Sequence, residues 1–236
     1  MQVMNEILDI WKDFSANCES LGLELTELQI EKISLFHSLL MEKNKALNLT
    51  RIENLDEAIL KHYLDTVFLI LAVKQRSSLA SIRSILDLGS GGGVPGVILG
   101  ILLPDITELT LVEARNKKLE FLKFACSELG LPLRAIHDHW TPARAKQWVK
   151  NNSKADLVTA RAVSEPLNLV RILSPVVGRW LLLPRGPSEG IDLFGSTDKL
   201  ACGMGFKRGH CDFFRHSFRN LEIQRQVWIW NISSVD

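Results

Sequence analysis

The sequence predicts an α/β protein with a doubly wound, mostly parallel sheet of the Rossmann-like type, preceded by a helical extension. From residue 82 onward, short apolar runs alternate with helical patterns, which is typical of successive βαβ units. Before that point only helical periodicity appears, and one apolar run leads directly into the glycine-rich turn 89–93. We therefore divide the chain into a helical extension, 1–78, packed on a Rossmann-like domain, 79–236.

Three amphipathic helices are predicted in the extension, because apolar residues recur there at helical spacing. These residues are Ile7, Leu8, Trp11, Phe14 and Cys18; Leu28, Ile33, Phe36, Leu39 and Leu40; and Ala58, Ile59, Tyr63, Val67, Ile70 and Leu71. Thr26 with Gln29 has the spacing of a capping box for the second helix. Only the short polar run 74–78 separates these helices from the glycine turn, so we expect them to pack on the following domain.

The second part of the chain predicts alternating strands and helices. We expect strands at 82–88, 109–112, 133–136, 157–160, 180–183 and 222–230, and helices at 95–103, 116–130, 141–150 and 165–173. Gly130 is a typical helix stop, and Pro166 fits a first helical turn. In open α/β sheets, ligands bind at the carboxyl ends of the strands, so the loops that follow the strands are the expected site.

The glycine turn has the composition of a nucleotide-cofactor loop. Gly89, Gly91 and Gly93 allow sharp backbone turns and close approach to a ligand, and Asp87 lies at the end of the strand before them. The next strand ends in Glu113, 24 residues after Gly89, where an acid that binds ribose hydroxyls is expected. A glycine-rich turn that binds no ligand is disfavoured, because the strand, the loop, the following helix and the acid at the end of the next strand all match a nucleotide-cofactor site.

Two cofactor classes fit this arrangement, the dinucleotides and S-adenosylmethionine. The run from Asp87 to Gly93 resembles the E/DxGxGxG pattern of class I S-adenosylmethionine methyltransferases. It lacks Gly-x-Gly-x-x-Gly spacing in its usual dinucleotide setting. The loop therefore favours a methyltransferase.

Composition excludes several other classes. The chain has 236 residues, of which 46% are hydrophobic, and its longest apolar runs are too short to cross a bilayer. Acids near the start of the sequence do not fit a signal peptide, so we expect a cytoplasmic protein without a membrane partner. The four cysteines lack Cys-x-x-Cys and metal-ligand spacing, which predicts reduced thiols and no metal. His137 and His139 alternate at a strand end, but no third ligand is evident.

Charge is unevenly distributed although the net charge is only +1. Between residues 199 and 225 there are six Lys or Arg residues, including Arg215, Arg219 and Arg225, against two acids. A polyanion could dock on such a stretch, and an ordinary solvated basic face explains it equally well.

Several segments together resemble the bacterial ribosomal small-subunit methyltransferase G family, also called glucose-inhibited division protein B. They are Asn48-Leu-Thr-Arg-Ile52, Lys61-His-Tyr-Leu-Asp-Thr66, Asp87-Leu-Gly-Ser-Gly-Gly-Gly-Val-Pro-Gly96, Thr159-Ala-Arg-Ala-Val163 and the Arg185-Gly186 step. The resemblance covers about residues 5 to 190. It implies methylation of guanine N7 at one guanosine in the decoding-region loop of 16S rRNA, alone or within the small ribosomal subunit. S-adenosylmethionine is the implied donor and S-adenosylhomocysteine the product.

The resemblance also implies roles for single residues. It assigns cofactor binding to Asp87, Gly89, Gly91, Gly93 and Val94 in the loop, Glu113 at the ribose, Trp140 and Thr141 beside the adenine, and Arg161 near the methionine end. Catalytic roles fall to Arg161, Arg185 and His139, and RNA contacts to Arg185 and Arg225. For Arg215 and Arg219, an RNA contact is a hypothesis that rests on charge and location alone. For Arg161, a structural salt bridge to Asp65 or Asp87 is the alternative. For His62 and Asp65, the alternatives are a catalytic pair, a helix-surface hydrogen bond and support for the loop.

Two residues depart from the family pattern. His139 stands where the family has an arginine, and Arg185 stands where it has a lysine, which keeps the charge but changes the geometry. The last strand is also altered and retains Arg225 as the counterpart of the family's arginine. Two alternative hypotheses therefore remain: a divergent relative that methylates another RNA or a small molecule, and a non-enzymatic S-adenosylmethionine-binding module.

Overall fold

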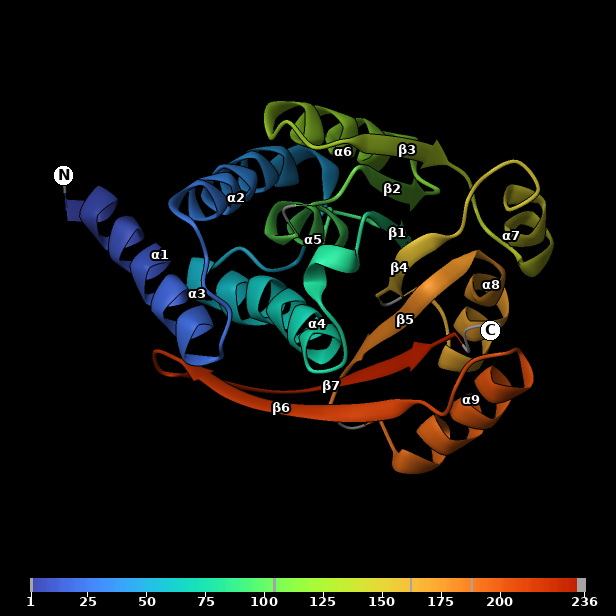
Figure 1. The fold of residues 1–236 in the computed structure, drawn as a ribbon. Helices are drawn as coiled ribbons and strands as arrows, with labels where there is room; N and C mark the ends of the chain where they lie inside the picture. The colour runs from blue at the N-terminus through green and yellow to red at the C-terminus, as the bar shows by residue number, and fades with distance from the viewer. Residues whose placement is uncertain (1, 104, 162, 188, 233–236) are drawn as a thin grey trace.

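The computed structural model describes residues 2–103, 105–161, 163–187 and 189–232, and shows a seven-stranded sheet between two layers of helices (Figure 1). The strands are β1 Ser84–Leu88, β2 Glu108–Glu113, β3 Leu133–His137, β4 Ala155–Ala160, β5 Val177–Arg185, β6 His210–Phe218 and β7 Leu221–Asn231. Their order in the sheet is β3-β2-β1-β4-β5-β7-β6. The first five strands are parallel, and β7 pairs antiparallel with both β5 and β6. The predicted fold class, a mostly parallel doubly wound sheet, is confirmed.

Helices cover both faces of this sheet. The α-helices are α1 Gln2–Ser20, α2 Glu27–Leu47, α3 Leu55–Ala58, α4 Leu64–Lys74, α5 Gly96–Leu102, α6 Asn116–Glu128, α7 Pro142–Trp148, α8 Pro166–Leu173 and α9 Ile191–Gly203. One layer contains α4, α5 and α6, with α2 packed over the last two, and the other contains α7, α8 and α9 (Figure 1). Because helices lie on both sides, the strands are apolar on both faces, and β1 is buried over four of its five residues.

The N-terminal helices pack on the sheet domain through shared apolar residues. Phe14 of α1, Phe36 of α2 and Phe68 of α4 belong to the same buried cluster as the sheet residues Ile85 and Leu109. The capping box is present: the Thr26 backbone N–H donates to Gln29 Oε1 at 2.9 Å, and the Gln29 N–H donates to Thr26 Oγ1 at 3.2 Å. The structure therefore joins these helices to the sheet by one core, and the division at residue 78 stays a prediction.

The third predicted helix begins with a change of pitch. Residues 59–63 form a π-helical turn, Ile59–Tyr63, between α3 and α4. Such a turn changes which side chains share a face. It places Lys61, His62 and Asp65 together at the edge of one cavity.

The prediction from sequence missed two elements, α9 and β6. One side of β6 packs on α4, where the rings of Phe214 and Phe68 stack with centroids 4.7 Å apart. Its other side carries exposed residues such as Phe213 and Arg215. In the sequence, charged and aromatic residues mask the alternation of apolar and polar positions along β6, so this edge strand looks like an irregular basic segment.

The carboxyl ends of the parallel strands meet at one edge of the sheet. The chain order reverses between β1 and β4, which is the switch point where ligands bind in such folds. Among the described helices, none combines the length and apolar character needed to cross a membrane.

Candidate active site

The glycine loop after β1 adopts backbone conformations that favour glycine. The φ angles are +71° at Gly89, +55° at Gly91 and +94° at Gly93. A Cβ at Gly93 would lie 2.9 Å from Val97 Cγ2 and 3.0 Å from the Phe36 ring. At Gly93 the loop therefore combines a left-handed backbone with packing that leaves no room for a Cβ.

Glu113, at the end of β2, fixes the glycine loop by hydrogen bonds. Its Oε2 accepts a hydrogen bond from the Gly91 N–H at 2.8 Å, and its Oε1 accepts one from the Arg115 N–H at 2.8 Å. A carboxylate oxygen has two lone pairs, so each oxygen keeps capacity for a ribose hydroxyl. Glu113 both shapes the loop and presents acceptors at its mouth.

Asp87 lies beneath the loop. The side chain is buried, and its Oδ2 accepts from the Gly96 N–H at 3.1 Å, which fixes the start of α5. Burial raises the pKa of Asp87 to about 7, against the opposing effects of the Gly96 hydrogen bond and the Arg161 charge. Asp87 thus supports the loop from below.

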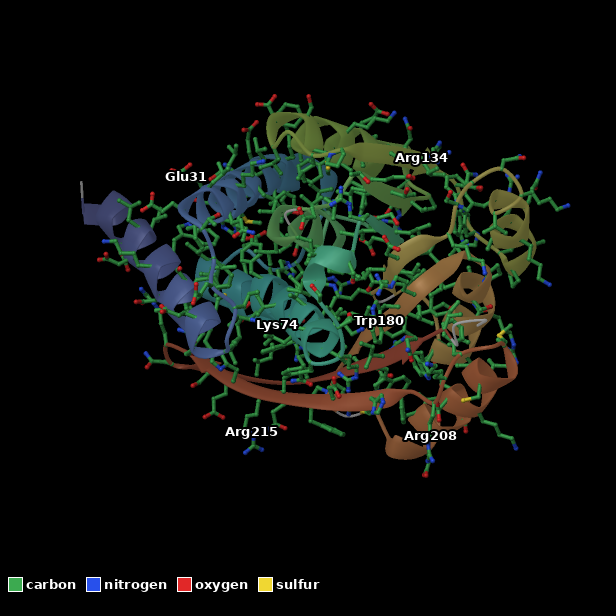
Figure 2. All side chains as sticks on the ribbon, in the orientation of Figure 1. Glu31, Lys74, Arg134, Trp180, Arg208 and Arg215 are labelled. Carbon is green, nitrogen blue, oxygen red and sulfur yellow. The ribbon has the colours of Figure 1, made fainter. Side chains whose placement is uncertain are left out.

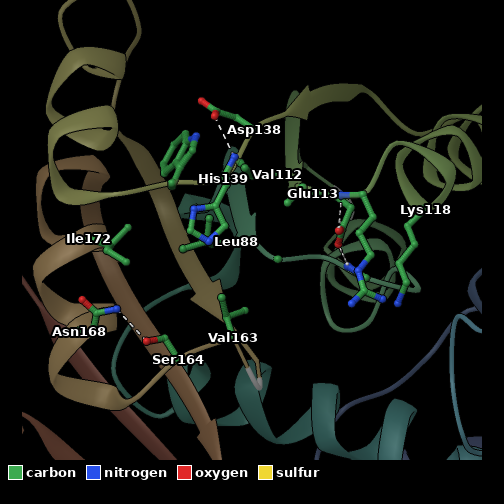
Figure 3. Close-up of a pocket in the computed structure, with 15 residues that line it drawn as sticks. Leu88, Val112, Glu113, Lys118, Asp138, His139, Val163, Ser164, Asn168 and Ile172 are labelled. Atoms are coloured by element: carbon green, nitrogen blue, oxygen red, sulfur yellow. Dashed lines mark hydrogen bonds between the residues drawn. The ribbon is translucent and has the colours of Figure 1, made fainter.

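A cavity of about 550 Å³, the glycine-loop cavity, opens above these residues. Figure 3 shows Glu113 and Lys118 on one side and His139, Asn168 and Ile172 on the other. The full lining is Leu88, Gly89, Gly91, Val112, Glu113, Ala114, Arg115, Lys118, Asp138, His139, Trp140, Val163, Ser164, Asn168 and Ile172. An apolar slot that ends in a carboxylate has the chemistry of a nucleoside site, with the base in the slot and the ribose at the acid.

The structure separates the predicted cofactor residues into three groups: those that line the glycine-loop cavity, those outside its lining, and Arg161, which lines a second cavity. Gly89, Gly91, Glu113 and Trp140 line the glycine-loop cavity, as does His139. Asp87, Gly93 and Val94 lie outside its lining and shape the loop from within the fold. Thr141 caps α7 by accepting from the Arg144 N–H at 3.3 Å.

Arg161 lines a second cavity of about 620 Å³, the arginine cavity. The two cavities lie on either side of the turn after β4, with Val163 in the first lining and Arg161 in the second. Ala162, part of the motif quoted above, lies outside the described residues. The lining of the arginine cavity is Thr50, Arg51, Ile52, Lys61, His62, Asp65, Arg161, Pro184, Arg185, Gly186, Glu189 and Arg225.

Arg161 is fixed by the helical segment that precedes α4. Its Nη1 donates to the Lys61 carbonyl at 3.1 Å, and its Nη2 lies 3.4 Å from His62 Nδ1. His62 Nδ1 also lies 3.1 Å from the Lys61 carbonyl, which only accepts, so Nδ1 carries the ring hydrogen and Nε2 accepts from the Thr50 hydroxyl at 3.0 Å. Burial and the Arg161 charge lower the pKa of His62 to about 4, which keeps the ring neutral.

Asp65 lies between two arginines of the same cavity. Arg225 Nε is 2.9 Å from its Oδ1, and Arg161 Nη1 is 3.8 Å from its Oδ2. Burial raises the pKa of Asp65 to about 6, and both arginines oppose that shift. The salt bridge expected as an alternative for Arg161 is present, yet 27% of the Arg161 side chain is exposed, so it also faces the cavity. These contacts indicate that Asp65 and His62 hold Arg161 in position.

Arg185 is the most enclosed cation of the arginine cavity, with 8% of the side chain exposed. Its Nη1 lies 3.6 Å from Glu189 Oε1, and its guanidinium packs 5.6 Å from the Trp228 ring centroid. Its Nε and Nη2 have no hydrogen-bond partner among the described residues. Buried donors of a charged group are costly without acceptors, so these nitrogens indicate a ligand with oxygen acceptors.

The remaining predicted RNA residues lie on the β6–β7 hairpin. Arg219, in its turn, pairs with Asp13 of α1 at 2.9 Å and with Asp56 of α3 at 3.8 Å. Arg215 points away from the molecule into solvent, as Figure 2 shows. The structure therefore gives Arg219 a packing role that the charge pattern did not indicate.

A family model described as rRNA small subunit methyltransferase G matches residues 29–201. The chain belongs to this family. The ribosomal RNA small subunit methyltransferase G of Acholeplasma laidlawii is 36% identical over 70% of this chain and 69% of its own length. The protein of the same name from Clostridium perfringens is 31% identical over 81% of this chain and 79% of its own.

Solved structures of low sequence identity show the same fold. A magnesium protoporphyrin IX methyltransferase from Synechocystis with bound S-adenosylmethionine has a TM-score of 0.53 at 11% identity, covering 84% of this chain and 97% of the other. An O-methyltransferase from Thermotoga maritima has a TM-score of 0.52 at 11% identity, covering 84% and 72%. The methyltransferase G assignment confirms the predicted enzyme class and its cofactor, S-adenosylmethionine.

For a methyltransferase G family member, the cofactor fits the glycine-loop cavity. The left-handed glycines, the Glu113 carboxylate and the apolar slot at Trp140 provide what a nucleoside requires. Sequence reasoning missed Lys118, Ser164, Asn168 and Ile172 of this cavity and Arg51, Lys61 and Glu189 of the other. Among these, only Arg51 and Lys61 lie in the quoted family segments, which was the one signal available.

Proposed function

We propose that this enzyme methylates N7 of one guanosine in the decoding-region loop of 16S rRNA, in the cytoplasm, with the RNA presented alone or in the small ribosomal subunit. Family membership supports a ribosomal RNA substrate, since the relatives carry that name. The structural observation that carries the proposal is Arg185, whose buried Nε and Nη2 have no acceptor among the described residues. We assign the arginine cavity to the target nucleotide.

The chemistry requires no proton removal. S-adenosylmethionine, when bound, supplies an electrophilic methyl group on a sulfonium. Guanine N7 has a free lone pair at neutral pH, so the chain's task is to orient the base and to balance charge. Asp65 and His62 are engaged with Arg161 and Arg225, which leaves them as positioning residues rather than bases.

The arginines can hold a guanosine without blocking its nucleophile. Because the N7 lone pair must point at the methyl group, the acceptors left for arginine are guanine O6 and the phosphate oxygens. Arg185, with unpaired buried donors, suits O6, and Arg161 and Arg225, which face the same cavity, suit a phosphate. This division fixes the base by one cation and the backbone by two.

The test is methyl transfer from labelled S-adenosylmethionine to small ribosomal subunits that lack their native N7 modification. The product is mapped by chemical cleavage at 7-methylguanosine. Label at one guanosine of the decoding-region loop is the expected result. Tight cofactor binding without label on RNA would overturn the proposal and favour the divergent relative, to which His139 and the altered last strand already point.

A further inference from the structure

Six basic residues come from the end of α2, the loop that follows it and the start of α6, near the two cavities. The basic collar consists of Lys43, Lys45, Arg51, Arg115, Lys117 and Lys118. Arg51 lines the arginine cavity, Arg115 and Lys118 line the glycine-loop cavity, and Lys43 and Lys117 line a third hollow of about 540 Å³ between α2 and α6. Five of the six residues therefore line the candidate active site or the hollow between α2 and α6, and Lys45 lies in the last turn of α2.

The loop between α2 and α3 connects these parts. The Leu49 carbonyl lies 3.1 Å from where a Cβ of Gly92 would be, so the loop rests on the glycine turn. Buried Asn44 accepts from the Thr50 N–H at 2.8 Å, and Thr50 is bound to His62. Arg51 is consequently held over the site by a fixed backbone.

Charge in the collar is largely uncompensated. The segments 42–53 and 115–120 contain six cations and three acids, Glu42, Glu53 and Glu120. Lys43 pairs with Glu42 at 2.8 Å. In the part of the chain that the structure describes, no carboxylate forms a salt bridge with the other five.

Folding does not explain the cations at the start of α6. Arg115 occupies the N-cap without a side-chain cap, the first turn contains no acid, and Lys117 and Lys118 lie in that turn. A helix N-terminus carries partial positive charge, so cations there destabilise the helix by a few tenths of a kcal/mol. A bound anion would benefit from the cations and from the helix dipole together.

The third hollow adds an exposed aromatic ring to this charge. Phe124 is 41% exposed, and Lys43 Nζ lies 5.4 Å from its ring centroid. Exposed aromatic rings among cations are the surface on which unpaired bases stack. The core of a protein–protein interface is instead depleted of lysine, and four of the six collar residues are lysines.

We propose that the basic collar binds the sugar-phosphate backbone of the substrate RNA next to the target nucleotide, with Phe124 as a stacking surface for an unpaired base. This inference rests on the proposed function. It assigns the main RNA grip to α2 and α6 rather than to the β6–β7 hairpin, where Arg219 is already paired with Asp13.

The test compares a collar double variant, Lys45→Ala with Lys117→Ala, with a matched pair, Lys150→Ala with Lys154→Ala. Lys45 and Lys117 line neither the glycine-loop cavity nor the arginine cavity. Lys150 and Lys154 are exposed lysines just before β4, at the amino-terminal end of that strand and so away from the carboxyl ends where the site lies. Binding to a decoding-region fragment of 16S rRNA is measured between about 50 and 200 mM salt, where each phosphate contact contributes a slope of about 0.7 to 0.9. S-adenosylmethionine affinity and melting temperature are measured on the same samples.

We expect the collar variant to bind the RNA about tenfold more weakly at low salt and to lose between one and two units of salt slope. Cofactor affinity and melting temperature stay at the wild-type values, and the matched pair binds as the wild type does. Phe124→Ala weakens binding with an unchanged salt slope, because stacking releases no counterions. Wild-type methylation together with collar variants that keep the wild-type affinity and slope would overturn this inference alone. A wild-type enzyme that neither binds nor methylates the RNA would overturn the proposed function as well.

Discussion

Asp65 of α4 and Arg225 of β7 form a partly buried ion pair, with Arg225 Nε donating to Asp65 Oδ2 at 3.1 Å. Arg161, in the turn after β4, lies 3.8 Å from the same oxygen. One carboxylate thus orients two cations that belong to different strands and that both face the arginine cavity.

Replacing Asp65 by asparagine keeps the size of the side chain and removes the charge that aligns both arginines. We expect Asp65→Asn to lower the rate of methyl transfer at least tenfold, about 1.4 kcal/mol, with cofactor affinity within about twofold of the wild type. Asp212→Asn is the control, because Asp212 pairs with Arg76 at 2.6 Å and lies outside both cavity linings. Equal loss in both variants would indicate a general effect on folding.

The Asp65 pair also predicts opposite pH dependences for activity and stability. Burial raises the pKa of Asp65 to about 6, so the charge that aligns the arginines forms as pH rises through that value, and activity should rise with it. In the unfolded chain an aspartate ionises near 4, so this group lowers the free energy of unfolding as pH rises from about 4 to about 6. The difference between wild type and Asp65→Asn, measured by denaturation and by initial rates across this range, isolates both effects. A difference that does not change with pH would contradict the assignment.

Gly93 and Gly130 share a left-handed backbone but differ in their surroundings. A Cβ at Gly93 would lie within 3.2 Å of Val97, Phe36 and Leu122, whereas one at Gly130 has nothing within 4 Å. Both alanine variants carry a backbone cost of about 1 kcal/mol, and Gly93→Ala adds about 1–3 kcal/mol for overpacking. We expect Gly93→Ala alone to weaken S-adenosylmethionine binding, as titration calorimetry on the two variants would show.

Glu113 accepts two backbone hydrogen bonds that shape the glycine loop. Glu113→Ala should weaken S-adenosylmethionine binding about tenfold to a hundredfold, because the loop loses its anchor and the ribose loses its acceptors. Glu113→Gln retains one oxygen and should give a smaller loss. Glu108→Ala, on the same strand but paired at the surface with Arg134, should bind the cofactor like the wild type.

Arg219 joins α1 to the β6–β7 hairpin through Asp13. Because the pair is partly exposed, we expect Arg219→Ala to cost only about 0.5–1 kcal/mol of stability. Its clearer effect is faster hydrogen exchange in α1. Arg215→Ala removes an exposed cation of the same strand pair and should leave that exchange unchanged. Unaltered α1 exchange in Arg219→Ala would return Arg219 to the RNA role that its charge suggests.

The sequence alone determined the parallel part of the fold and, in the glycine-loop cavity, the side formed by the glycine turn and Glu113. Strand, glycine turn, helix and Glu113 are close in sequence, and their conformations follow from local rules: apolar runs, left-handed glycines and helix caps. For the same reason, the capping box at Thr26 and the helix stop at Gly130 could be predicted from neighbouring residues alone. The edge strand β6 and helix α9 escaped because their amphipathic patterns are weak and charged.

Only the tertiary structure decided the arginine cavity. Its residues come from the loop before α3, the π-helical turn, α4, the turn after β4, β5 and the loop after it, and β7. Up to 175 positions separate them, from Thr50 to Arg225. Whether an arginine is paired, half-buried or left with unsatisfied donors depends on which carboxylate the fold brings to it: Asp65 for Arg161 and Arg225, Asp13 for Arg219 and Glu189 for Arg185. Ion pairs depend on distances in space, which no local pattern in the chain encodes.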